Sequence, residues 1–73
     1  MEEKILNGVR ENRRNAGITQ ENLARAMGVS RQTIISIERG RYIPSLPLAL
    51  KIAKFFQRPV GEMFRLEEGE RHD

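Results

Sequence analysis

The 73-residue chain contains no cysteine and no tryptophan, and aromatic residues make up only 5% of it. Without cysteine, neither a disulfide nor a cysteine-based zinc site can stabilise so short a chain. Hydrophobic runs are also short, and none approaches the roughly 18 residues that a membrane-spanning helix needs. The N-terminus lacks the basic and then apolar segments of a secretory signal. These absences predict one small cytoplasmic domain with a thin core and no place in a membrane.

Residues that carry out catalysis or bind metals are scarce. The only histidine is His72 and the only aspartate is Asp73, both at the end of the chain. Thr19, Ser30 and Ser45 are placed to begin helices, which leaves no pair of nucleophile and general base. His72 and its acidic neighbours are one conceivable metal site, but a flexible tail is the favoured interpretation. We therefore predict a protein that is not an enzyme, with no cofactor, no metal site and no evident small-molecule ligand.

The charges are unevenly distributed along the chain. The formal net charge is only +3, but residues 4–58 contain eleven basic and three acidic residues. Residues 59–73 contain five acidic and two basic residues. A basic body attracts polyanions such as nucleic acids. We predict a domain over residues 1–66 with a polyanionic partner, followed by an acidic tail over residues 67–73.

Hydrophobic residues recur at helical rather than strand spacing, so we predict an all-α fold, a compact bundle of five helices. Capping residues mark the helix starts, and glycines mark several of the ends. The predicted helices cover residues 3–15, run from Thr19 to Gly28 and from Ser30 to Gly40, begin after Ser45, and begin again at Pro59. In the fourth helix we expect the core-facing residues to be Leu46, Leu50, Ala53 and one of Phe55 or Phe56.

The second and third predicted helices are typical of a helix-turn-helix unit, because Ser30 follows Gly28 by only two residues. Gly28 permits a sharp turn, since glycine adopts positive φ without steric cost. Ala24 is small and lets the following helix cross closely. Leu23 and Ile34 supply apolar contacts that fix the crossing angle of the two helices.

The helical period divides the third helix into two faces. The face opposite the predicted core carries Arg31, Gln32, Ile35, Ser36 and Arg39. Arginine reads guanine, glutamine reads adenine, and an apolar group contacts the methyl group of thymine. For a lone helix, a solvated face without a partner is the favoured interpretation. For a two-helix unit within a basic body, we favour contact with double-stranded DNA.

Two charged residues fall on buried helix faces. Glu38 lies one turn from Ile34 in the third helix, and Arg13 lies one turn from Val9 in the first. Burial of either charge without a partner costs several kcal/mol. We therefore predict that Arg13 and Glu38 form an ion pair with each other. The alternative is that both side chains reach water independently.

Three sequence segments resemble the Cro/phage-repressor (XRE) helix-turn-helix family of short prokaryotic proteins. The segments are TQENLA at residues 19–24, GVSRQTI at residues 28–34 and IERG at residues 37–40. With the following loop and helix, the resemblance covers about residues 4–66. It implies a five-helix bundle, similar to the DNA-binding domain of lambda repressor, with the third helix in the major groove.

The resemblance also implies roles for individual residues. The base-reading positions are Arg31, Gln32 and Ser36, to which the helical period adds Ile35. The candidates for phosphate contact are Gln20, Thr33, Arg39, Arg41 and Tyr42. Gln20 is also expected to brace the third helix, and Arg13 and Glu38 match an internal ion pair of relatives. The chain departs from the family pattern at Asn12, where leucine is usual, at Ile43, where asparagine is common, and at Gln57, where glycine is usual.

The C-terminal part carries more apolar surface than a thin bundle readily buries. The candidates for a symmetric dimer contact are Phe56, Met63, Phe64 and Leu66; ordinary core packing is the alternative. We predict a sequence-specific, double-stranded DNA-binding transcriptional regulator, dimeric on a palindromic operator. The competing hypothesis is a protein-interaction module, such as an antitoxin or a coactivator-like adaptor.

Overall fold

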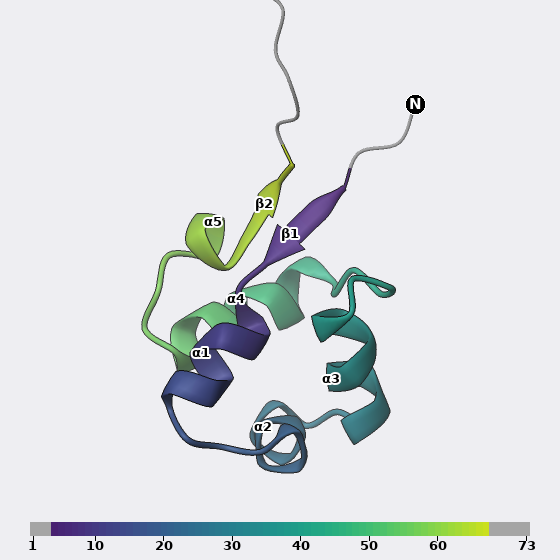
Figure 1. Ribbon diagram of the computed structural model, residues 1–73, viewed down its shortest axis with the longest axis vertical. Coiled ribbons are helices and arrows are strands. Elements are labelled where there is room, and N and C mark those ends of the chain that lie inside the picture. Colours follow the sequence, from purple (N-terminus) through teal and green to yellow (C-terminus); the bar gives the residue numbers. More distant parts are fainter. Residues whose placement is uncertain (1–3, 68–73) are drawn as a thin grey trace, which may run out of the picture.

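Five helices and two short strands make up the part of the chain that the computed structural model describes, residues 4–67. Their order is β1 (Ile5–Asn7), α1 (Val9–Asn15), α2 (Gln20–Met27), α3 (Arg31–Glu38), α4 (Leu46–Phe55), α5 (Val60–Met63) and β2 (Phe64–Leu66). In Figure 1 the two strands lie side by side at one end of the molecule, and α2 lies at the other. The predicted number of helices is therefore confirmed for residues 4–67.

The predicted all-α class is wrong in one respect, because residues 5–7 and 64–66 form a two-stranded sheet. β1 pairs antiparallel with β2, with Leu6 opposite Arg65, and the Glu67 N–H donates to the Lys4 carbonyl at 2.8 Å. The first helix was predicted from residue 3, but it begins only at Val9. The start is late because backbone groups of residues 4–8 bond to residues 63–67 instead, including the Gly8 N–H to the Met63 carbonyl at 2.9 Å.

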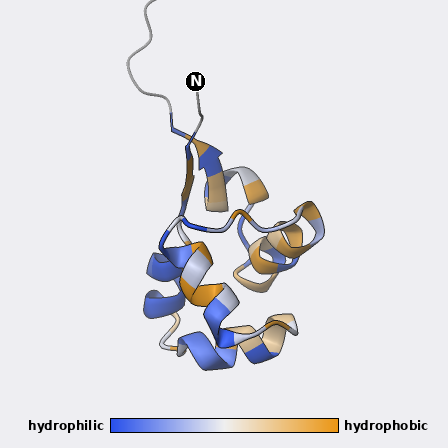
Figure 2. Cartoon of the chain, turned by 90° about the vertical axis from the view of Figure 1, so that its right-hand side faces the viewer, coloured by the Kyte–Doolittle hydropathy of each residue, from blue (hydrophilic) through white to orange (hydrophobic). Residues whose placement is uncertain are grey.

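The core lies where α2, α3 and α4 meet, covered by α1 and α5. Its members are the fully or nearly fully buried residues Val9, Leu23, Ala24, Met27, Ile34, Ile37, Ile52, Ala53 and Met63. In Figure 2 the helices carry both orange and blue segments, as amphipathic helices that bury one face do. Burying one large aliphatic side chain of this kind contributes roughly 1.5–3 kcal/mol.

Helix α4 buries only part of the predicted face. Leu46 and Leu50 are 67% and 47% exposed, so their predicted place in the core is wrong. The prediction for Ala53 is confirmed, because it is buried, and Ala49 and Ile52 complete the buried face. The small alanines allow close approach of the neighbouring elements, an advantage that side-chain hydrophobicity alone does not reveal. Of the two adjacent phenylalanines, Phe56 packs against the core and Phe55 is 44% exposed, which confirms that one of them faces inward.

Helix α4 ends without the usual glycine. Gln57 adopts a φ of 58°, the left-handed conformation that glycine normally supplies. The Arg58 N–H donates to the Ala53 carbonyl and the Gln57 N–H to the Lys54 carbonyl, each at 3.0 Å. This pair of bonds is a Schellman motif, so the helix stops at the expected place at the cost of a strained glutamine.

Two sequence-based predictions concern residues at the C-terminal end. Only Glu67 of the predicted acidic tail is among the described residues; the rest of the tail, including His72 and Asp73, lies outside them. Among residues 4–67, no helix is long and apolar enough to cross a membrane.

Candidate nucleic-acid interface

The predicted two-helix unit is present, and its turn is built as the sequence indicates. Thr19 caps α2 by accepting a hydrogen bond from the Asn22 N–H at 3.0 Å. Gly28 ends the helix with a φ of 76°, a conformation that strains any other residue. Ser30 then caps α3 by accepting from the Thr33 N–H at 3.1 Å. Capping of this kind contributes about 1 kcal/mol per helix, so local chemistry sets both helix starts.

Helix α3 is held against the rest of the domain by its inner face. Ile34 and Ile37 are completely buried, and Ala24 of α2 is 3% exposed. Lys51 of α4 holds the turn between α2 and α3, because its Nζ donates to the Met27 carbonyl at the end of α2 at 3.1 Å. These contacts leave the opposite face of α3 free to meet a partner.

The predicted base-reading residues lie together on that outer face. Arg31 and Gln32 are exposed, and Ile35 and Ser36 are half-buried. The Gln32 Nε2 lies 3.5 Å from the Ser36 Oγ, so the two polar side chains are neighbours one turn apart. The face therefore presents a guanidinium group, an amide, a hydroxyl and an aliphatic side chain within about one and a half turns.

The predicted phosphate-contacting residues flank this face. The N–H groups of Arg41 and Tyr42 donate to the Ser36 carbonyl at 2.9 and 3.3 Å, which folds the loop back onto α3. Both side chains are exposed, and Tyr42 shares an open hollow with Arg39 between β1 and the loop. The Thr33 hydroxyl lies 2.9 Å from that of Ser30, so it is already engaged at the helix start.

A buried ionic cluster connects α1, α2 and α3. Arg13 Nε donates to Glu38 Oε2 at 2.7 Å, and Arg13 Nη2 donates to Oε1 at 3.2 Å, the bidentate pair that the helical spacing predicts. Gln20 Nε2 donates to Oε1 at 3.0 Å, and Arg13 Nη1 donates to the Ile18 carbonyl at 2.9 Å. The Glu38 side chain is 3% exposed and that of Arg13 is 12% exposed. Three donors thus surround the Glu38 carboxylate, which satisfies its burial.

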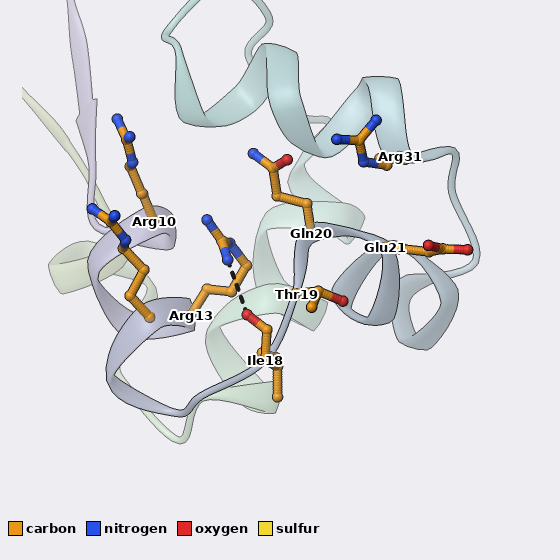
Figure 3. A pocket seen from close by; sticks show the side chains of 8 residues that line it. Arg10, Arg13, Ile18, Thr19, Gln20, Glu21 and Arg31 are labelled. Carbon is orange, nitrogen blue, oxygen red and sulfur yellow. Dashed lines mark hydrogen bonds between the residues drawn. The ribbon is translucent and has the colours of Figure 1, made fainter.

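Beside this cluster lies an open, basic hollow of about 670 Å³. It is lined by Arg10, Arg13, Arg14, Ile18, Thr19, Gln20, Glu21 and Arg31. Figure 3 shows Arg10 on the α1 side, Arg31 on the α3 side and Gln20 between them. The one acidic residue of the lining, Glu21, lies 3.4 Å from Arg25, which faces it from the next turn of α2. The hollow therefore has a strongly positive lining.

Comparisons with known proteins identify the two-helix unit. A family model described as helix-turn-helix matches residues 9–63, most of the chain. The chain belongs to the Cro/phage-repressor (XRE) helix-turn-helix family. An uncharacterized HTH-type transcriptional regulator of Methanocaldococcus jannaschii is 58% identical over 53 residues, 73% of this chain and 80% of that protein. The HTH-type regulator YgzD of Bacillus subtilis is 50% identical over 64 residues, 88% of this chain and 97% of that protein.

A phage protein is a more distant relative of this helix-turn-helix chain. The cryptic phage CTXphi transcriptional repressor RstR of Vibrio cholerae is 33% identical over 55 residues, 75% of this chain and 50% of that protein. Family membership makes the chain a DNA-binding regulator of the helix-turn-helix type rather than an enzyme.

The residues proposed for a dimer contact are not equally accessible in this helix-turn-helix fold. Met63 is completely buried in the core of a single chain, so its place in a contact between two chains is wrong. Phe56 and Phe64 pack against the core and are only partly exposed. Leu66 is 51% exposed at the end of β2. Leu66 is thus the candidate with the most surface to offer.

Sequence reasoning missed two side chains that position α3. Asn7 Nδ2 donates to the Ile37 carbonyl at 3.0 Å and thereby ties the end of α3 to β1. Lys51 holds the turn from α4, as described above. A single sequence carries no sign of either contact, because both join residues more than 20 positions apart and neither forms part of a local motif.

Proposed function

We propose that this chain recognises specific sequences in double-stranded DNA, with α3 in the major groove. The observation that carries the proposal is the separation of α3 into a buried face and an outer face of base-reading side-chain types. An α-helix fits the major groove, where each base pair presents a distinct pattern of donors and acceptors. The basic surface around α3 favours the same partner.

The four base-reading candidates on the outer face have distinct proposed roles. Arg31 is suited to donate two hydrogen bonds to guanine, and Gln32 to pair with adenine. Ile35 offers an apolar contact to a thymine methyl group, and Ser36 can donate to or accept from either base type. A well-formed bidentate contact provides roughly 1–3 kcal/mol of discrimination against the wrong base.

The flanking residues are proposed to hold the DNA backbone. Gln20 is placed for this task, because its Nε2 has two hydrogens and Glu38 accepts only one of them. Arg39, Arg41 and Tyr42 present exposed side chains at the other end of α3. Thr33 completes the proposed set, because its hydroxyl can accept from the Ser30 hydroxyl and still donate to a phosphate. Such contacts fix orientation on the duplex without reading its sequence.

We further propose that the regulator acts in the cytoplasm as a homodimer on a palindromic operator. Dimers of this motif place their recognition helices about 34 Å apart, which matches half-sites one helical turn apart. Leu66, with the exposed parts of Phe56 and Phe64, is the proposed contact between the two chains. A domain this small gains stability when it buries such apolar surface against a second copy.

Selection of bound sites from a random duplex library tests the DNA-binding proposal directly. The expected result is one enriched sequence with two-fold symmetry. About six phosphate contacts predict that the logarithm of affinity falls with the logarithm of salt concentration at a slope near −5. No enriched sequence, together with affinity that does not depend on salt, would instead favour a protein-interaction module such as an antitoxin.

A further inference from the structure

Two arginines of α1 lie in the basic hollow without a structural task. Arg10 and Arg14 are one helical turn apart, both are exposed, and both line the hollow together with Gln20 and Arg31. Within residues 4–67, neither guanidinium group lies within 4.0 Å of a carboxylate. Two positive charges close together on one helix repel each other, so the arrangement does not stabilise the isolated domain.

The neighbouring arginines show what a structural role looks like in this fold. Arg13, between the two in sequence, is 12% exposed and donates to both Glu38 and the Ile18 carbonyl. Arg25 lies beside Glu21 on the same helix. Arg10 and Arg14 have neither kind of partner among the described residues, and their charges remain available to an anion outside the domain.

We propose that Arg10 and Arg14 form a second contact site for the DNA backbone, outside the base pairs that α3 reads. This inference rests on the proposed function. A strand whose phosphate sits on Gln20 places its next phosphates on either side of that residue, and the α1 wall of the hollow lies on one of those sides (Figure 3). The two arginines are about 6 Å apart along the α1 axis. Successive phosphates of one strand are roughly 3.4 Å apart along the duplex axis, so the pair of arginines spans about two phosphate steps. Guanidinium groups bind phosphate through two parallel hydrogen bonds.

The site extends the footprint of the regulator beyond the two-helix unit. It lies on α1, which contributes nothing to base reading, so it adds affinity for every sequence alike. The preference for particular base pairs is left to Arg31 and Gln32. Affinity and sequence preference are thereby carried by different helices and can change independently.

The test compares the wild-type chain with Arg10→Gln, Arg14→Gln and the double variant. Fluorescence anisotropy measures binding to a selected duplex and to a random duplex from 50 to 200 mM salt. Each lost phosphate contact reduces the steepness of the salt dependence by about 0.9, so the double variant should lose about 1.8. Over this fourfold salt range, the gap between wild type and double variant should then close by roughly 12-fold, equally on both duplexes.

Two control variants separate a phosphate contact from a general loss of charge. Arg65→Gln removes the same charge from an exposed residue that lines another hollow, beside Glu11 and Glu62. It should leave the salt slope unchanged within about 0.3. The double variant Arg10→Lys and Arg14→Lys should retain most of the slope, because lysine also contacts phosphate as a point charge.

The outcomes are distinguishable. A slope that is unchanged in the glutamine variants, or equally reduced in Arg65→Gln, would overturn this inference while leaving the proposed function intact. If the wild-type chain binds no duplex at all, the proposed function itself fails. Inorganic phosphate titrated into the DNA-free protein tests a free-anion site; saturation at Arg10 below millimolar concentration, together with an unchanged salt slope in the glutamine variants, would assign the hollow to a free anion and overturn the inference. Circular dichroism of each variant verifies that it is folded.

Discussion

The buried pair of Arg13 and Glu38 allows a quantitative test of how this thin core is stabilised. A domain of 73 residues has a free energy of unfolding of about 4–11 kcal/mol. Removing one partner of a buried pair costs roughly 3–5 kcal/mol, because the remaining charge is left without compensation. Glu38→Ala should therefore remove a large part of the total stability and lower the midpoint of thermal unfolding by about 12–40 °C.

The double variant Arg13→Met and Glu38→Leu is the informative comparison. It removes both charges and replaces them with apolar side chains, so no ion is left buried and the cost should be smaller than that of Glu38→Ala. Because the residues are in direct contact, their free-energy changes should not add, and a coupling of about 2 kcal/mol is expected. Gln20→Ala removes only one neutral donor and should cost about 1.5–3 kcal/mol, since that donor serves a charged acceptor.

Urea unfolding followed by circular dichroism, with linear extrapolation to water, gives these free energies. The measurement is repeated in 1 M salt, because a buried pair is screened far less than an exposed one. The reasoning is refuted if Glu38→Ala costs under about 1 kcal/mol, or if its cost vanishes in high salt. Either result would mean that the pair behaves like an ordinary surface ion pair.

Three further predictions concern recognition, helix ending and assembly. Gln32→Ala should cost about 1–3 kcal/mol of binding free energy on the selected site and relax the preference at one base pair, whereas Arg41→Ala should weaken binding to every duplex alike. Equal losses of affinity for selected and random DNA in Gln32→Ala would contradict the base-reading role of Gln32. Gln57→Gly should raise the free energy of unfolding by about 0.5–1 kcal/mol, since relief of the left-handed strain outweighs the added entropy of the unfolded chain, and Gln57→Ala should give no such gain. In analytical ultracentrifugation at tens of micromolar, the wild type should sediment as a dimer and Leu66→Glu as a monomer of 8.4 kDa. If Leu46→Glu dissociates the dimer and Leu66→Glu does not, the contact lies on α4 instead.

Local chemistry made much of the fold predictable from the sequence. Thr19, Ser30 and Ser45 begin α2, α3 and α4 because each side chain accepts a hydrogen bond from a backbone N–H three residues later. The glycine of the turn was predictable for the same reason, since only the local backbone is involved. The β1–β2 pairing was not predictable, because each strand has three residues, too few to show alternation, and the partners lie at opposite ends of the chain.

The candidate site, like the fold, was predictable from the sequence only in part. The outer face of α3 follows from the helical period once its core side is known, and the Arg13–Glu38 pair follows from the cost of burying a charge. The facing of Arg10 and Arg14 depends on how α1 is rotated against α2 and α3, which no local pattern records. The error at Leu46 and Leu50 has a similar origin, because hydrophobicity alone does not fix how α4 is rotated, and the face that is buried carries Ala49, Ile52 and Ala53.

The short sheet brings the two ends of the described chain together, with Lys4 and Glu67 joined by a backbone hydrogen bond. In Figure 1 this junction lies at the opposite end of the molecule from α2. Any additional domain, whether it precedes or follows these residues, therefore attaches at the same point. Such a fold can be inserted into a larger protein, or circularly permuted, with little rearrangement. The same end of the molecule is tied to the helix-turn-helix unit by Asn7, which donates to the Ile37 carbonyl in the last turn of α3.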